Sequence, residues 1–136
     1  MNSEVTGIEQ EEQHWYIDVD WFERNARSFS TLAERSLCSK CRKRLKGDPG
    51  KLSADEFFAN IKDCCSGERG FISGATPIME SVFRLFLSNG NLALDIIELG
   101  RQLSDRRGVD TYRTSIEVLS RLLSHDQYYG IRPVES

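Results

Sequence analysis

Four cysteines are the residues of this sequence that could do chemistry most directly. Cys38 and Cys41 form a CxxC motif, and the adjacent pair Cys64 and Cys65 follows later in the chain. The CxxC spacing lets two thiolates reach one tetrahedral metal ion while backbone amides point at the sulfurs. The simplest prediction is one structural zinc ion bound by all four cysteines, because four thiolates leave no open position for water or substrate.

Adjacent cysteines are an uncommon ligand pair, because successive side chains of an ideal helix point about 100° apart. The helix that carries Cys64 and Cys65 must therefore end there, and Gly67 is suited to end it. A variant of this site keeps a single cysteine of the pair and uses His14 as the fourth ligand. The thiols could also be buried without a metal, or take part in redox chemistry or disulfides. A thioredoxin-like site is disfavoured, because the CxxC motif does not follow a strand in a βαβ unit.

A basic segment directly follows the CxxC motif, in a chain whose formal net charge is −3. Its cations could contact phosphates, balance the charge of −2 on a four-thiolate zinc site, or form a solvated surface. The chain has no Lys or Arg before Arg24, so the whole sequence does not have the composition of a nucleic-acid binder. The cations of the basic segment are Arg42, Lys43, Arg44 and Lys46.

Catalytic motifs are missing from the sequence. Residues 47–52 only superficially resemble a phosphate-binding loop, because Leu52 stands where Ser or Thr is required. His14 and His125 each stand alone, and a lone histidine is more often structural or exposed than catalytic. The sequence therefore predicts a binding or structural protein, not an enzyme, with no small-molecule substrate.

Capping signals predict the helices that position the cysteines. Asp20 is a candidate N-cap, and residues 31–34 fit a capping box for a helix that runs to about Leu37 and enters the CxxC motif. Residues 53–56 form another capping box, and its helix ends near the Cys64-Cys65 pair. The aromatic residues that we expect to anchor a core here are Trp15, Tyr16, Trp21, Phe22 and Phe29.

The C-terminal half has the clearest pattern of helix starts and stops. We predict a helix from Thr76-Pro77 to Gly90, a second from Asp95 to residues 106–108, a third from residues 114–117, and a strand over 128–134 that Pro133 confines to a sheet edge. The aliphatic residues predicted to line the core are Ile78, Val82, Leu85, Leu99, Leu103, Leu119, Leu122 and Leu123.

This half resembles a winged helix–turn–helix domain of the HARE-HTH type, the type that includes the N-terminal domain of the bacterial RNA polymerase delta subunit. The resemblance covers a little under half of the chain and is one of pattern and element order. It implies a winged-helix fold, and a role in transcription through contacts with DNA or protein. The residues that carry it are 77–87, 89–91, 94–99, 119–123 and 126–132.

The expected architecture is mainly α with a small β wing. We predict a disordered acidic tail over residues 1–14, a zinc-stapled helical region over 15–70, and a winged-helix-like domain over 71–136, with residues 66–75 as the linker. The acidic N-terminus lacks the features of a secretory signal, and no apolar run is long enough for a membrane span. We therefore expect a cytoplasmic protein without membrane association, whose thiols stay reduced.

Two functions are compatible with this sequence. The first is a transcription-associated module that binds DNA or a nucleoprotein. The second is a protein–protein interaction adaptor, with a transcription-machinery protein as one partner to expect, in which zinc and winged helix are scaffolding. A single surface that gathers the cations would favour nucleic acid, and an exposed apolar patch would favour a protein partner. The further cations predicted to contact phosphates are Arg106, Arg107, Arg113 and Arg121.

Overall fold

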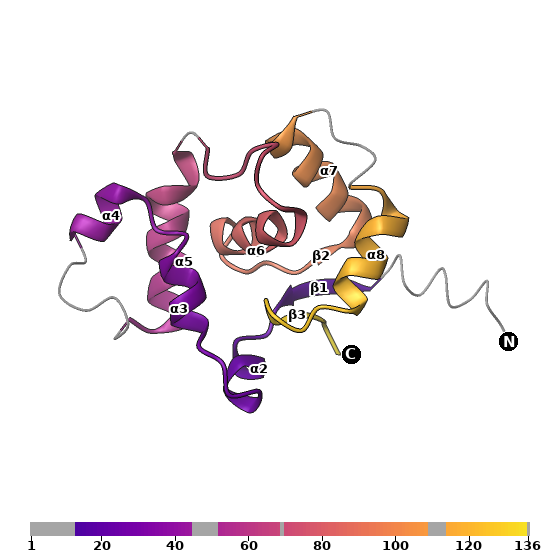
Figure 1. Cartoon of the computed structure of the whole chain (residues 1–136), viewed down its shortest axis with the longest axis horizontal. Coiled ribbons are helices and arrows are strands. Elements are labelled where there is room, and N and C mark those ends of the chain that lie inside the picture. The colour runs from indigo at the N-terminus through magenta and orange to yellow at the C-terminus, as the bar shows by residue number, and fades with distance from the viewer. Residues whose placement is uncertain (1–12, 45–51, 69, 109–113, 136) are drawn as a thin grey trace, which may run out of the picture.

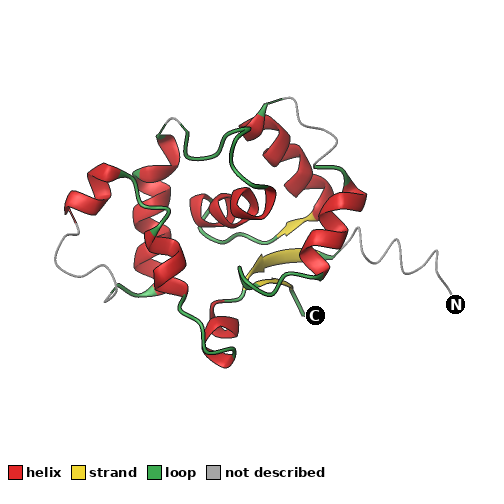
Figure 2. Ribbon diagram, viewed as in Figure 1, coloured by secondary structure: helices red, strands yellow, loops and turns green. Residues whose placement is uncertain are grey.

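The structure is a computed structural model that describes residues 13–44, 52–68, 70–108 and 114–135. It is mainly helical with a small antiparallel sheet, as the sequence predicted (Figures 1 and 2). In chain order the elements are β1 (His14–Ile17), α2 (Val19–Arg24), α3 (Phe29–Glu34), α4 (Ser39–Arg44), α5 (Ala54–Asp63), η2 (Cys65–Gly67), α6 (Ile78–Ser88), β2 (Leu94–Asp95), α7 (Ile96–Arg107), α8 (Ile116–Ser124) and β3 (Ile131–Pro133).

The sheet has the strand order β2-β1-β3, so the strand nearest the N-terminus lies in its centre. Trp15 pairs with Leu94 of β2 and with Pro133 of β3, and both pairings are antiparallel. Trp15 and Ile17 are buried while Tyr16 between them is half-buried, as expected for a strand with one face on the core. Sequence analysis identified Trp15 as a core residue but did not identify the strand.

A single buried cluster runs through the described residues and contains side chains from both halves of the chain. The helix α6 lies in the middle, with α3, α4 and α5 on one side and α7 and α8 on the other (Figure 1). The Phe29 ring connects three helices, because its centroid lies 6.1 Å from those of Phe57 in α5 and Phe83 in α6. Six of the eight predicted aliphatic core residues are fully buried, and Ile78 and Leu122 are half-buried.

Two helix starts in the N-terminal half differ from the prediction. The helix α2 begins at Val19 with Asp18 as its N-cap residue, not after Asp20. The helix α3 is capped by Ser28, whose hydroxyl accepts a hydrogen bond from the Thr31 amide at 3.2 Å. The predicted capping box at residues 31–34 is therefore wrong, because Thr31 already lies inside the first turn that Ser28 caps.

The predicted starts of α6 and α8 are each displaced by one residue. Pro77 is the N-cap residue of α6, and Thr76 instead accepts a hydrogen bond from the Ser73 amide. The N-cap of α8 is Ser115, because the Thr114 hydroxyl lies 2.7 Å from that of Ser104 in α7. The predicted capping box of α5 and the predicted N-cap of α7 are confirmed, with side-chain caps at Ser53 and Asp95. Pro133 lies in the edge strand β3, as predicted.

The segment predicted to be a linker is packed where the structure describes it. Phe71 and Ile72 are buried, and the carbonyl oxygen of Phe71 accepts a hydrogen bond from Arg84 of α6 at 2.8 Å. The predicted zinc-binding region and the predicted C-terminal domain therefore share both a sheet and a core. Among the described helices, none combines the length and the apolar character required to cross a membrane.

Candidate metal centre

The four cysteines meet at one place between α4 and α5. Their sulfur atoms all lie within 4.8 Å of one another, and Cys41 and Cys65 are buried while Cys38 and Cys64 are half-buried. Cys38 immediately precedes α4 and Cys41 lies in its first turn, whereas Cys64 and Cys65 lie at the junction of α5 and η2. Two separate segments of the chain thus each contribute two sulfurs to the cluster.

The CxxC motif opens a helix, and the prediction that it ends one is wrong. The helix α3 stops at Glu34, and α4 starts immediately after Cys38. The Cys38 carbonyl accepts the amide of Arg42 at 2.9 Å, which makes it the first acceptor of the new helix. The first turn of a helix leaves backbone N–H groups without helical partners, and such groups stabilise a thiolate.

The adjacent pair converges because the helix ends at this pair, as the sequence predicted. The helix α5 ends at Asp63, and Cys64 has φ −126° and ψ −64°, outside the helical range. Cys65 then begins the 3₁₀ turn η2. Its sulfur accepts a hydrogen bond from the Cys38 amide at 3.1 Å, while the Cys64 sulfur lies 3.6 Å from that of Cys38.

The electrostatics of the cluster favour one thiolate among three thiols. Burial raises the pKa of Cys38, but hydrogen bonds from the Cys41 amide and from the other three thiols outweigh it and lower that pKa to about 7. Hydrogen bonds to Cys41 and Cys38 raise the pKa of Cys64 to about 11, and burial raises that of Cys65 to about 11 as well. Burial also raises the pKa of Cys41. A divalent cation would displace the remaining thiol protons and stabilise the four closely spaced sulfur atoms.

The geometry suits a metal ion and not a disulfide. A disulfide requires sulfurs about 2.05 Å apart, and all four cysteines are free. Tetrahedral zinc, with Zn–S bonds of about 2.3 Å, places its sulfurs about 3.8 Å apart, so small adjustments of the sulfur positions would complete such a site. The cluster can therefore hold a metal ion with all four cysteines.

The arrangement in which His14 replaces one cysteine is not the one found. His14 lies in β1, paired across the sheet with Asp95, and β1 is separated from α4 in Figure 1. Within the described part of the chain, the four cysteines form the one group of potential ligands close enough to share a metal.

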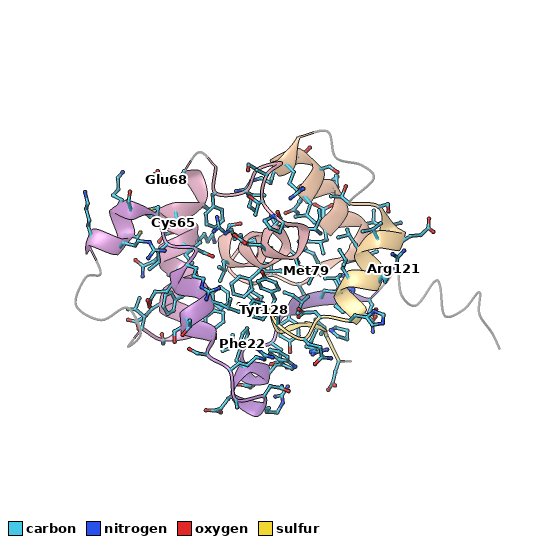
Figure 3. The ribbon with its side chains drawn as sticks, viewed as in Figure 1. Phe22, Cys65, Glu68, Met79, Arg121 and Tyr128 are labelled. Atoms are coloured by element: carbon cyan, nitrogen blue, oxygen red, sulfur yellow. The ribbon has the colours of Figure 1, made fainter. Side chains whose placement is uncertain are left out.

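Among the described residues, the cations predicted to bind phosphate lie on three separate helices, α4, α7 and α8. Arg42 and Lys43 are exposed on α4, and Arg42 donates to the Leu37 carbonyl at 3.1 Å. Arg121 is exposed on α8, and Figure 3 shows it on the opposite side of α6 from Cys65. Arg106 reaches the Ser66 carbonyl at 3.4 Å. The positions of Lys46 and Arg113 and of the side chain of Arg44 lie outside the described residues.

Arg107 is buried, in contrast to its predicted place on a binding surface. Only 7% of its surface is exposed. Its guanidinium donates to the carbonyl of Thr76 and to the hydroxyl of Ser81 at 2.9 Å. The carbonyl oxygens of Ser73 and Gly74 lie 3.4 Å away. The prediction that Arg107 contacts phosphate is therefore not supported by its position, because its polar atoms are already engaged in holding the turn before α6.

Sequence analysis missed one polar site, a pocket of about 270 Å³ beside Tyr128 that contains Arg27 and Arg35. Both arginines precede the basic segment and their spacing follows no motif, so only the fold reveals that they line the same pocket. No protein-family model, curated protein sequence or solved structure matches this chain significantly, so its own geometry is the basis for a functional proposal.

Proposed function

We propose that this chain is a non-enzymatic protein-interaction module whose cysteine cluster holds a structural zinc ion. Four thiolate donors in a tetrahedral arrangement favour zinc over harder divalent cations, which prefer oxygen ligands. A site of four sulfurs leaves no position for substrate, so the metal would stabilise the fold. Four free cysteines also suit a reducing compartment such as the cytoplasm.

The succession of elements supports a winged-helix-like arrangement for the C-terminal part. The helices α6, α7 and α8 follow one another with β2 between the first two, and β3 comes last. In this proposal α8 occupies the place of the helix that often enters a DNA groove. Its exposed residues include Glu117 and Arg121, so its charges nearly cancel. Such a surface suits a protein partner better than a polyphosphate backbone.

One observation carries this proposal: an apolar groove is open to solvent. The groove has a volume of about 500 Å³ and is lined in part by Met79, Leu122 and Tyr129. Tyr128 at its rim is 41% exposed. Exposed apolar surface of this kind, rimmed by polar residues, is typical of protein interaction sites.

Nucleic-acid binding in a transcription complex is the second candidate function. The observation that favours it is a set of exposed cations on α4, namely Lys40, Arg42 and Lys43. Within the described residues none of them forms an ion pair with a carboxylate. They lie beside the cysteine cluster, where they could contact phosphates or offset the charge of a four-thiolate site.

Two measurements on the zinc-loaded full chain separate the candidates. The first is fluorescence anisotropy with a short duplex across a salt series. The protein-interaction proposal expects no binding at physiological salt. Duplex affinity that falls steeply with salt in the wild type, and less steeply in the double variant Arg42→Ala/Lys43→Ala, would support nucleic-acid binding as the function instead.

The second measurement is selection of binders from a displayed random-peptide library, with the chelated protein as the counter-selection. We expect enriched peptides with micromolar dissociation constants that require the metal-loaded fold. A selection that yields no such peptide would overturn the protein-interaction proposal, and duplex binding would then support the nucleic-acid candidate.

A further inference from the structure

The pocket beside Tyr128 combines apolar and cationic side chains. Its lining includes the apolar side chains of Phe22, which is buried, and Leu32, which is half-buried, and the exposed side chains of Arg27 and Arg35. Hydroxyl groups of Ser28, Thr31 and Tyr128 also line it, and the lining contains no carboxylate. Such a pocket presents two positive charges and several hydrogen-bond donors to whatever enters it.

Both arginines are arranged around the Tyr128 ring. Arg35 donates to the Tyr128 hydroxyl at 3.3 Å, and the Arg27 guanidinium carbon lies 5.8 Å from the ring centroid. In the part of the chain that the structure describes, neither arginine forms an ion pair. Other arginines do: Arg24, Arg84 and Arg101 pair with Asp18, Glu80 and Glu98. The charge of Arg27 and Arg35 is therefore available to an anionic ligand.

The turn that presents Tyr128 is held rigidly. The carboxylate of Asp126 is buried and accepts the amides of Tyr128, Tyr129 and Ile131 at 2.9 to 3.1 Å. Gly130 follows with φ +67°, and a Cβ there would come within 2.5 Å of the Phe22 ring. A rigid turn lowers the entropy lost on binding, because Tyr128 is already fixed in place before a ligand arrives.

Tyr128 also lines the apolar groove on its other side. Met79 and Leu122 belong to that groove, and Figure 3 shows Met79 and Tyr128 near each other in the middle of the molecule, with Phe22 below. The cationic pocket and the apolar groove are thus neighbours that share one exposed aromatic side chain. A ligand that fits both must carry an anionic group close to an apolar one.

We infer that this surface, formed by Arg27, Arg35, Tyr128, Met79 and Leu122, binds an acidic segment of a partner protein. A carboxylate of the segment lies against the two guanidinium groups, and a nearby leucine or phenylalanine enters the groove. This inference rests on the proposed function and names the chemistry of the partner. Nucleic acid fits poorly, because it offers no aliphatic side chain for the groove and two cations neutralise few phosphates.

The test uses fluorescein-labelled peptides in which two glutamates stand one to four residues before a leucine or phenylalanine, added to the zinc-loaded full chain. We expect the best spacing to bind with a micromolar dissociation constant. Arg27→Ala and Arg35→Ala should each weaken binding about tenfold. Tyr128→Ser should weaken it by a similar factor. Lys43→Ala removes the same charge from α4 and should leave the affinity unchanged, which makes it the matched control.

A charge exchange gives the sharpest version of the test. The double variant Arg27→Glu/Arg35→Glu should lose the glutamate peptides and gain binding of the same peptides with lysine in place of glutamate. Both arginines are exposed, so the variant should fold, and its circular dichroism and zinc content verify this. A variant that still binds the glutamate peptides as tightly as the wild type would overturn the inference. Absence of binding at every spacing would overturn it too.

The library selection distinguishes this failure from failure of the proposed function. The selected peptides could bind the wild type and the charge-exchange variant equally. This result would show that a partner binds elsewhere on the protein. It would support the proposed interaction module and overturn the inference about this surface. If the selection also yields nothing, the interaction module itself is overturned. Competition of the glutamate peptides by a short duplex at physiological salt would instead assign the surface to phosphate.

Discussion

The helices around the cysteines and the helices around the sheet are held together in different ways. We call α3, α4, α5 and η2 the cysteine lobe, and the three strands with α6, α7 and α8 the sheet lobe. The helices α3 and α4 have six residues each, while α6 and α7 have 11 and 12. Short helices are unstable without tertiary support, and α4 adds little apolar surface because its described side chains are polar apart from Cys41.

The contrast indicates that the proposed metal ion would cross-link one lobe, whereas buried apolar area stabilises the other. The sheet lobe buries Val82, Leu85, Leu99 and Leu103 from helices of ordinary length. The cysteine lobe shares the core through Phe29 and Phe57, but its outermost helix α4 depends on the sulfur cluster for attachment. Removing a metal should therefore affect the lobes unequally, whereas removing a core residue should affect both.

Loss of the metal is the change with the largest expected effect. Chelation, or Cys41→Ser, should lower the free energy of unfolding by several kcal/mol, since structural zinc binds with an apparent free energy of roughly 10 kcal/mol in small domains. Hydrogen exchange followed by mass spectrometry should show α3, α4 and α5 losing protection while α6 and α7 retain it. Elemental analysis should find one zinc ion per chain before chelation.

Ser39→Ala is the matched control for the metal prediction. Ser39 is exposed in α4 between the two cysteines of the CxxC motif, and it offers no sulfur. We expect its zinc content and protection pattern to equal those of the wild type. Uniform loss of protection in both lobes on chelation would contradict the contrast between them.

The next largest effect on stability is expected for a change at Arg107, which lies in the sheet lobe. Arg107→Met should lower the free energy of unfolding by about 3 kcal/mol, because it leaves the Thr76 carbonyl and the Ser81 hydroxyl without a charged donor in a buried place. Chemical denaturation measures this directly. Arg101→Met, in the same helix but exposed, should change stability only slightly, because solvent screens its ion pair. If the Arg107→Met variant is as stable as the wild type but binds a duplex more weakly, Arg107 contacts phosphate, as the sequence analysis predicted.

The difference between the lobes also explains which features could be predicted from the sequence. The cysteine cluster could be predicted because the CxxC spacing and the helix break at Cys64 are local properties of the chain. The caps at Ser53 and Asp95 could be predicted for the same reason. The caps and each pair of cysteines depend on residues that are neighbours in sequence, whereas the meeting of the two pairs depends on the fold.

Features that depend on distant residues could not be predicted. The strand β1 has four residues and becomes a strand only because β2 and β3 flank it, more than 70 positions away. Its place is fixed by Asn91, whose side chain accepts from the Ile17 amide and donates to the Ile17 carbonyl, both at 2.9 Å. The burial of Arg107 likewise depends on Ser81 in α6, 26 positions before it, and on the turn before α6, 31 to 34 positions before it.

A helix cap in the cysteine lobe should have a smaller effect, and one that is linked to the metal. Ser53→Ala removes the hydroxyl that accepts the Glu56 amide at 3.2 Å and leaves half of a capping box. The expected cost is about 1 kcal/mol. If folding of this lobe is coupled to zinc, the same change should weaken zinc affinity by roughly fivefold, as a competitive chelator titration would measure. An unchanged zinc affinity would show that α5 is folded before the metal binds.

The smallest expected effect belongs to an exposed ion pair on the sheet lobe. Glu98 accepts hydrogen bonds from Arg101 and from Gln102, which lower the pKa of its carboxyl to about 2 from an ordinary value of 4.5. Because the pKa is lower in the folded state, the stabilising contribution is complete above pH 4.5 and is lost as the pH falls through about 2. Solvent screens the pair, so the effect on stability should be slight.

Thermal unfolding of the chelated protein avoids interference from zinc release at low pH. Glu98→Gln should lower the melting midpoint slightly at pH 6, and the difference should shrink at pH 3. A difference that does not change with pH would mean that the charge of the Glu98 carboxylate contributes nothing to the stability of the sheet lobe.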